Sequence, residues 1–329
     1  MARIRLGVLT PAGVALAGVL ACALSASAQA PAPASTPASP DGVKTVEEVV
    51  VTAPRPEAVH SFVQAVTAET SNRRLARWNR TVCPGVLGLK SSYAQHVNDQ
   101  IAAVAMHVGL KVGEPGCKPN ILVIVAKDGQ AFTADLAKRE KDLFDVSGLG
   151  AGSRGRAALE DFLATPRPVR WWHLSETVNE DGQAVGGRGG DARGGGISGG
   201  MEGDQGPSAP KVRVRSVSRV KATVRDDFSG VIVIVDAKTA NGVSLLALSS
   251  YISMVALAQI DPRADAEGIP TILNLFHDRD AGRAMPVGLT DWDVAYLEGT
   301  YLARQDRKAR LATERDIEKR MRDALAARQ

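Results

Sequence analysis

Two cysteines are the residues whose chemistry this sequence predicts most directly. Cys83 and Cys117 form an even pair once an N-terminal signal peptide containing Cys22 is removed. Disulfides persist in oxidising compartments, so an exported chain is expected to join these two residues. Two unpaired buried thiols are the alternative. A metal site is disfavoured because neither cysteine has a second thiol or a histidine at ligand spacing.

The histidines lack the spacing of a metal site. The chain contains His60, His96, His107, His173 and His277. None of them has a histidine or cysteine partner two to five positions further on, the pattern that zinc sites use. His96 and His107 are expected on one helix but about 16 Å apart along its axis, too far for one ion. We therefore predict no metal and no other cofactor.

Two further patterns match a functional motif without its context. Residues 150–155 fit G-x-G-x-x-G, but no buried strand precedes them. A loop is therefore predicted there, and not a dinucleotide site. Asp261, Asp265 and Glu267 miss the alternating ligand spacing of a calcium loop. They are expected to end the helix before them.

The N-terminus predicts export. Arg3 and Arg5 precede an apolar run at 6–24 that ends in small residues, which describes a signal peptide over 1–28. Export to the periplasm is the expected localisation, without a transmembrane helix in the mature chain. The alternatives are an uncleaved membrane anchor and a lipoprotein anchored through Cys22.

Composition narrows the class of protein. The 329 residues are 44% hydrophobic and 23% charged, which is typical of a globular chain and excludes one that is wholly disordered. The formal net charge is +4 at pH 7 and lower once Arg3 and Arg5 are removed. A nearly neutral mature chain gives no electrostatic reason to expect a nucleic acid partner.

Pro-rich and Gly-rich stretches divide the mature chain. Residues 29–56 are expected to form a flexible leader, and 57–303 a single α+β domain. A glycine-rich insertion at 180–210 interrupts that domain and is predicted to be disordered. Residues 304–329 alternate in charge and predict a solvent-exposed helix. A sparse apolar stripe leaves docking of that helix as the alternative: Leu311, Ile317, Met321 and Leu325.

The first half of the domain predicts a strand–helix–strand unit. We expect a short strand at 77–82, a helix that is capped by Ser91 or Ser92 and runs to about Val108, and a buried central strand at 120–126. The apolar face of the helix is expected to contain Tyr93, Val97, Ile101, Val104 and Val108. Helices at 133–145 and 155–164 and an extended segment at 168–173 should follow.

The second half predicts two strands and two helices. Residues 211–225 alternate apolar and basic side chains and fit an edge strand protected by charge, with binding of an anionic ligand as the alternative. Residues 230–236 fit a buried strand, and 244–260 a buried core helix whose Ser249 and Ser250 lack a nucleophile motif. Thr290 begins the next helix. The fold class is therefore α+β, a mixed sheet packed with two long helices.

Residues 45–55 resemble the TonB box of TonB-dependent outer-membrane receptors. In that family the box is an extended segment that adds a strand to the envelope protein TonB. The resemblance implies a TonB-like partner bound through five residues: Glu47, Glu48, Val49, Val50 and Val51. The rest of the chain is too short and too helical for the receptor's plug and barrel, so it is not a transporter. An ordinary strand or linker is the alternative.

The order of elements over 75–303 resembles secreted bacterial proteins related to zincin metalloproteases. In active zincins the buried helix carries His-Glu-x-x-His, but residues 249–257 contain neither histidine nor glutamate. The resemblance implies a zincin-like layout that has lost its metal. We therefore expect an exported, non-catalytic binding protein of the cell envelope. A peptidase-like hydrolase with an unrecognised site is the alternative.

Overall fold

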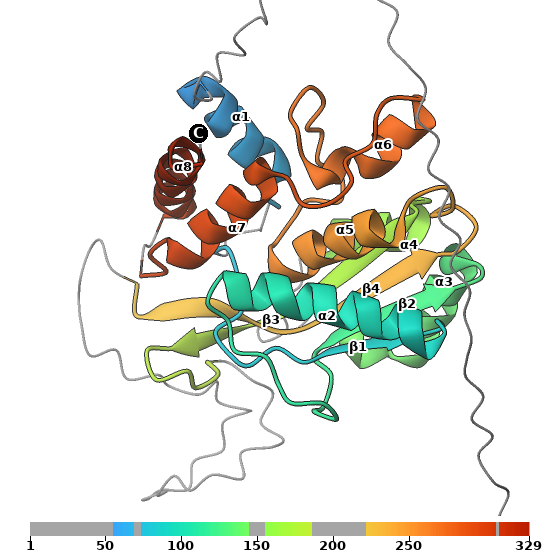
Figure 1. Cartoon of the computed structure of the whole chain (residues 1–329). Coiled ribbons are helices and arrows are strands. Elements are labelled where there is room, and N and C mark those ends of the chain that lie inside the picture. Colours follow the sequence, from blue (N-terminus) through green and yellow to red (C-terminus); the bar gives the residue numbers. More distant parts are fainter. Residues whose placement is uncertain (1–54, 69–73, 145–154, 186–221, 307–308, 329) are drawn as a thin grey trace, which may run out of the picture. The chain divides into compact units, whose positions relative to one another are not determined.

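The structure is a computed structural model (Figure 1). It describes residues 55–68, 74–144, 155–185, 222–306 and 309–328. The chain divides into two compact units, Met1–Val50 and Val51–Gln329, and all described residues belong to the second. Predictions that concern the signal peptide and most of the leader therefore lie outside the described residues.

A mixed sheet of four strands forms the centre of the described unit. The strands are β1 (Pro84–Leu87), β2 (Ile121–Ala126), β3 (Val169–Asn179) and β4 (Val224–Asp236). Their order is β1-β2-β4-β3, in which β1, β2 and β4 are parallel and β3 is antiparallel to β4. The predicted central strand at 120–126 is confirmed as β2, which has neighbours on both sides.

The predicted strand at 77–82 is wrong. Arg77 and Val82 form only isolated bridges, to Asp227 and Val112, and β1 begins after Cys83. The side chains of Asn79 and Arg80 in this segment instead bond Asp227 of β4 and Glu176 of β3. The predicted strand at 230–236 is confirmed but starts earlier, at Val224, and the extended segment at 168–173 continues as β3 to Asn179.

Helix α2 (Ser91–His107) connects β1 to β2, as the sequence predicts. Its cap differs from the prediction, since Lys90 holds the N-cap position and makes no side-chain bond there. Tyr93 is also 52% exposed and not part of the buried face. Gly109 ends the helix with φ of 83°, which favours glycine.

Cys83 and Cys117 are joined in a disulfide with a Cα–Cα distance of 6.1 Å. The bridge spans 34 positions and ties the start of β1 to the loop before β2. A closed loop of that length stabilises a fold by about 3.5 kcal/mol when the bond is unstrained. The pairing predicted from cysteine count is confirmed.

Helices cover both faces of the sheet (Figure 1). On one face lie α2 and α5 (Leu245–Leu257), and on the other α3 (Gly129–Arg139) and α4 (Arg156–Ala164). The helix expected at 133–145 begins earlier, because the Asp128 carboxylate accepts a hydrogen bond from Ala131 N. A short 3-10 turn at Lys141–Phe144 follows it.

Three further helices pack together beside α5. They are α1 (Pro56–Val66), α7 (Asp291–Leu302) and α8 (Arg310–Ala326), with the short α6 (Leu275–Asp280) next to α5. The predicted helix start at Thr290 is confirmed, since Thr290 and Asp293 form a reciprocal capping box. None of the helices in the described ranges combines the length and the apolar character needed to cross a bilayer.

The prediction that the C-terminal helix is solvent-exposed is wrong. Ile317, Met321 and Leu325 of α8 are buried against α1 and α7. Buried Glu318 accepts from His60 Nδ1 at 2.9 Å, and buried Glu314 accepts from Gln64 Nε2 at 3.0 Å. Three of the four residues of the sparse apolar stripe therefore dock, Leu311 stays exposed, and Glu314 and Glu318 beside the stripe find partners on α1.

Substitutions on the buried and the exposed side of α8 should differ sharply in their effect on the free energy of unfolding. Ile317 is 1% exposed and Leu311 is 59% exposed. We expect Ile317→Ala to lower the free energy of unfolding by about 3 kcal/mol and Leu311→Ala to change it by about 0.5 kcal/mol or less. Urea denaturation followed by circular dichroism measures both. Equal small effects would show that α8 does not dock in solution.

Candidate functional site

Helix α5 is the element where the sequence predicts a buried rod without reactive groups. Ser249, Ser250 and Ser253 are all buried in its middle. Ser249 donates to Leu246 O and Ser253 to Ser249 O, so both hydroxyls bond their own helix. Ser250 Oγ accepts from Gln100 Nε2 of α2 at 3.3 Å. The prediction of a buried core helix is confirmed.

The C-terminal end of α5 lies inside the protein, where its last carbonyls need donors. Three side chains supply them: His173 Nε2 to Val255 O at 2.8 Å, Trp78 Nε1 to Ala256 O at 2.9 Å and Tyr301 Oη to Leu257 O at 2.6 Å. A fourth, Trp171, donates from Nε1 to Ile260 O at 3.1 Å, three positions past the helix. We call these four side chains the α5 cap. Aromatic side chains therefore satisfy the backbone carbonyls at the end of this buried helix and just beyond it.

The tyrosines around α5 are held as neutral phenols. Burial raises the pKa of Tyr296 to about 12, and burial likewise raises the pKa of Tyr251 and of Tyr301. Tyr296 shares a hydrogen bond of 3.0 Å with Thr67. None of these three groups would be an anionic nucleophile near neutral pH.

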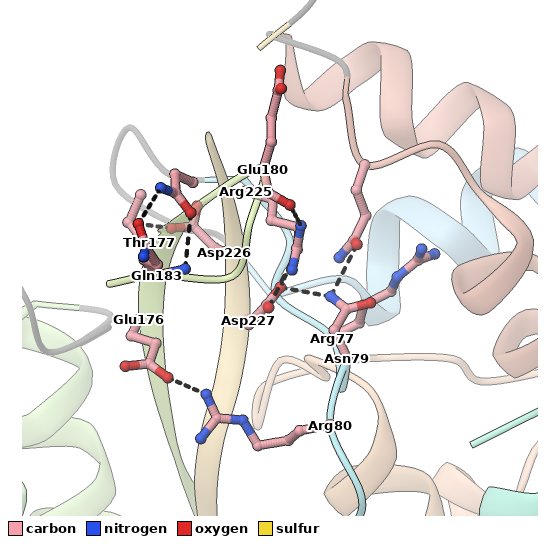
Figure 2. A network of polar contacts seen from close by, with 12 residues as sticks. Arg77, Asn79, Arg80, Glu176, Thr177, Glu180, Gln183, Arg225, Asp226 and Asp227 are labelled. Atoms are coloured by element: carbon pink, nitrogen blue, oxygen red, sulfur yellow. Dashed lines mark hydrogen bonds and ion pairs between the residues drawn. The ribbon is translucent and has the colours of Figure 1, made fainter. Parts of the chain in front are cut away.

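A polar cluster surrounds the end of the antiparallel β3–β4 pair at which β3 ends and β4 begins (Figure 2). Asp226 and Asp227 are 3% and 4% exposed at the start of β4. Asp226 accepts from the hydroxyl of Thr177, its cross-strand partner, at 2.5 Å and from Arg74 N at 3.1 Å. The Asp226 carboxylate is thus bound both by β3 and by the segment before β1.

Asp227 faces the acidic Glu176 directly across the hairpin. Like charges in this position repel, and cations offset them here. Asp227 accepts from Arg225 Nε at 3.0 Å and from Asn79 Nδ2 at 2.5 Å, while Arg80 pairs with Glu176. Arg80 and Arg225 therefore offset the negative charges of Glu176 and Asp227. Asn79 and Arg80 also tie the segment before β1 to the two strands.

Arg77 joins the same region to helix α7. Its Nη1 donates to the carbonyls of Thr300, Tyr301 and Ala303 at 2.7–2.8 Å, which caps the C-terminus of α7. Burial lowers the pKa of Arg77, with Tyr301 and Asp227 acting in the opposite direction. A guanidinium remains charged under all ordinary conditions.

Successive residues of a strand point to opposite faces of the sheet. Asp226 and Asp227 therefore do not form the facing pair of carboxyls that general acid–base catalysis uses. A hollow of about 400 Å³ adjoins them, bordered by Glu180, Arg225 and Gln305 among the described residues.

The five histidines lie in separate places and do not meet at a common site. His60 and His107 bond Glu318 and Glu298, and His277 Nδ1 accepts from Arg283. His173 belongs to the α5 cap and stacks on Phe228, while His96 is exposed on α2. Within the part of the chain that the structure describes, no group of three or more metal-ligating side chains occurs.

The prediction that Asp261, Asp265 and Glu267 end the buried helix is wrong, because α5 already ends at Leu257 and Ala258 is its extended C-cap. Asp261 N donates to Val66 O and Asp261 pairs with Arg263, while Glu267 pairs with Arg283. Other predicted features lie outside the described residues. They are the TonB-box-like residues 45–54, the glycines at 150–154, the insertion from 186 and the basic residues 211–221.

Sequence reasoning missed the buried Asp226 and Asp227. The available signal was two adjacent acids within a strand that otherwise continues as an apolar run. Comparison with known proteins adds nothing to these observations: no family model, no curated protein and no solved structure matches this chain.

Proposed function

We propose that this protein is exported and works in the cell envelope by binding, without chemistry at α5. The observation that supports this best is that the serine hydroxyls and the last carbonyls of α5 have hydrogen-bond partners within the protein. Its serines bond their own backbone or α2, and its terminal carbonyls are filled by Trp78, His173 and Tyr301. The helix that would hold the reacting groups in a zincin acts here as core.

The disulfide between Cys83 and Cys117 supports export, because such bonds persist in oxidising compartments. We propose the periplasm, with residues 1–28 removed. N-terminal sequencing and intact mass of protein from the periplasmic fraction test this. A mature chain beginning at Gln29 is expected. A retained N-terminus, or a lipid mass on Cys22, would contradict soluble periplasmic export.

The proposed binding segment is the TonB-box-like stretch 45–55. It leads directly into α1, whose Val59, Phe62 and Val63 are fully buried. A partner that adds a strand to the segment would thus be joined to a helix anchored in the core. Main-chain hydrogen bonds supply affinity in this mode, so removal of one N–H should weaken it.

Pull-down of the mature protein by a purified TonB periplasmic domain tests the segment. We expect Val50→Pro to abolish capture, while the matched control Val43→Pro, outside the segment, leaves it unchanged. No capture of the wild type, or equal capture of both variants, would remove the TonB-like partner from the proposal. Stoichiometric zinc that is lost together with a hydrolytic activity on chelation would contradict the binding role.

A further inference from the structure

A second hollow, of about 420 Å³, opens where β4 ends and β3 begins. Three cationic side chains border it, Arg167, Lys238 and Arg279, together with the carboxylate of Asp280. Arg167 is itself paired with Asp161 at 3.1 Å. Thr239 and Asn241 add a hydroxyl and an amide. The hollow is thus rich in hydrogen-bond donors, and the cations that can engage a ligand are Lys238 and Arg279.

The location is one where α/β sheets commonly bind ligands. Strands β2 and β4 are parallel neighbours, and their continuations leave for opposite faces, to α3 and α5. Ligands tend to bind outside the carboxyl ends of strands at such a switch point. Lys238 lies just past β4, and its Nζ is 3.4 Å from Asp128 just past β2.

Arg279 is held in one orientation by the protein itself. Its Nη1 donates to Thr239 O and Asn241 O at 2.7 and 2.8 Å, and its guanidinium carbon lies 5.0 Å from the Phe276 ring centroid. Its Nη2 and Nε face Asp280 at 2.7 Å. Asp280 is 65% exposed, so an incoming anion can displace it at little cost.

The loop that carries Lys238 is equally fixed. The Asp236 carboxylate accepts from Gly129 N, Lys238 N and Thr239 N at 2.8–3.2 Å. Desolvation would raise the pKa of Asp236, but these backbone bonds outweigh it and lower that pKa. The Lys238 side chain is 60% exposed, and its single long contact with Asp128 leaves ammonium N–H groups for a ligand.

We propose that this hollow binds a small molecule through an oxyanion group, a carboxylate or a phosphate. Lys238 and Arg279 are its principal contacts, and Thr239 and Asn241 donate hydrogen bonds. No residue of this site belongs to the leader segment, so the site extends the proposed binding role to a small ligand and its test is independent of the TonB test.

Isothermal titration of the mature protein at low salt, with citrate and with pyrophosphate, tests the site. We expect saturable one-to-one binding, at least about tenfold weaker in Lys238→Gln because a charge-assisted hydrogen bond is lost. Asp280→Asn should bind several-fold more tightly, because it removes the competing carboxylate. The control Lys319→Gln, at an exposed position of α8, should match the wild type.

The outcomes separate the ligand classes. Binding of citrate alone assigns a carboxylate ligand, binding of pyrophosphate alone a phosphate, and binding of both the shared chemistry. Absence of binding at millimolar concentration would overturn the proposal. So would equal weakening in Lys238→Gln and Lys319→Gln, or weaker binding by Asp280→Asn, with circular dichroism confirming that each variant is folded.

Discussion

Replacing Trp78 with alanine should lower the free energy of unfolding by about 4 kcal/mol. The side chain is 1% exposed, packs against Phe228 with ring centroids 5.6 Å apart, and donates to Ala256 O in the α5 cap. Its loss opens a cavity and leaves a buried carbonyl without its donor. Urea denaturation monitored by circular dichroism measures the change.

Trp78→Phe is the matched control because it keeps an aromatic ring but removes the indole N–H. We expect it to cost about 2 kcal/mol, from the lost hydrogen bond and the smaller ring. A Trp78→Ala variant within about 1 kcal/mol of the wild type would contradict the packing described for the α5 cap.

Replacing Asp293 with alanine is the second change with a large expected effect. Asp293 is fully buried and accepts four hydrogen bonds, from Ile272 N, Thr290 N and the hydroxyls of Thr271 and Thr290. Without the carboxylate, two buried N–H groups lose their partner and α7 loses its capping box. We expect a loss of about 4 kcal/mol in thermal or urea unfolding.

Two other variants make the Asp293 result specific. Asp293→Asn keeps the volume and one acceptor oxygen, so we expect about half of the loss. Asp291→Ala removes an acid that is 74% exposed in the same turn, and should cost about 0.5 kcal/mol. Burial raises the pKa of Asp293, and its four donors act against that rise. Equal effects of Asp293→Ala and Asp291→Ala would contradict the buried role.

Local signals in the sequence predicted the elements whose stabilising partners lie nearby in the chain or are the only ones available. The Thr290–Asp293 spacing contains both halves of a capping box, and α7 begins there. The uncharged run that became α5 was long enough for a helix and too short for a membrane span. Cysteine count and export predicted the Cys83–Cys117 bridge. In each case the partner lies nearby or is the only one available.

Features that depend on distant partners could not be read from the sequence. The burial of α8 requires Glu318 and Glu314 to meet His60 and Gln64, about 250 positions earlier in the chain. Nothing in the local pattern of α8, with few apolar residues among many charges, distinguishes a docked helix from a solvated one. The same is true of the pairing of β3 with β4 across the insertion.

The polar cluster around Asp227 shows the same limit. Asn79 and Arg225 bind this carboxylate, yet Asn79 is 148 positions away from it. The sequence predicts residues 77–82 as a short strand that leads into Cys83. Their polar members instead bond the hairpin, which only the assembled sheet brings within reach.

The central claim is that α5 is a closed structural core and takes no part in chemistry. Native-state hydrogen exchange of its amides from Ser253 to Leu257 tests this most directly. The account predicts exchange only through global unfolding, at the same free energy that urea denaturation gives. Exchange through a local opening several kcal/mol below that value would show that α5 reaches solvent in the folded protein, and would contradict the account.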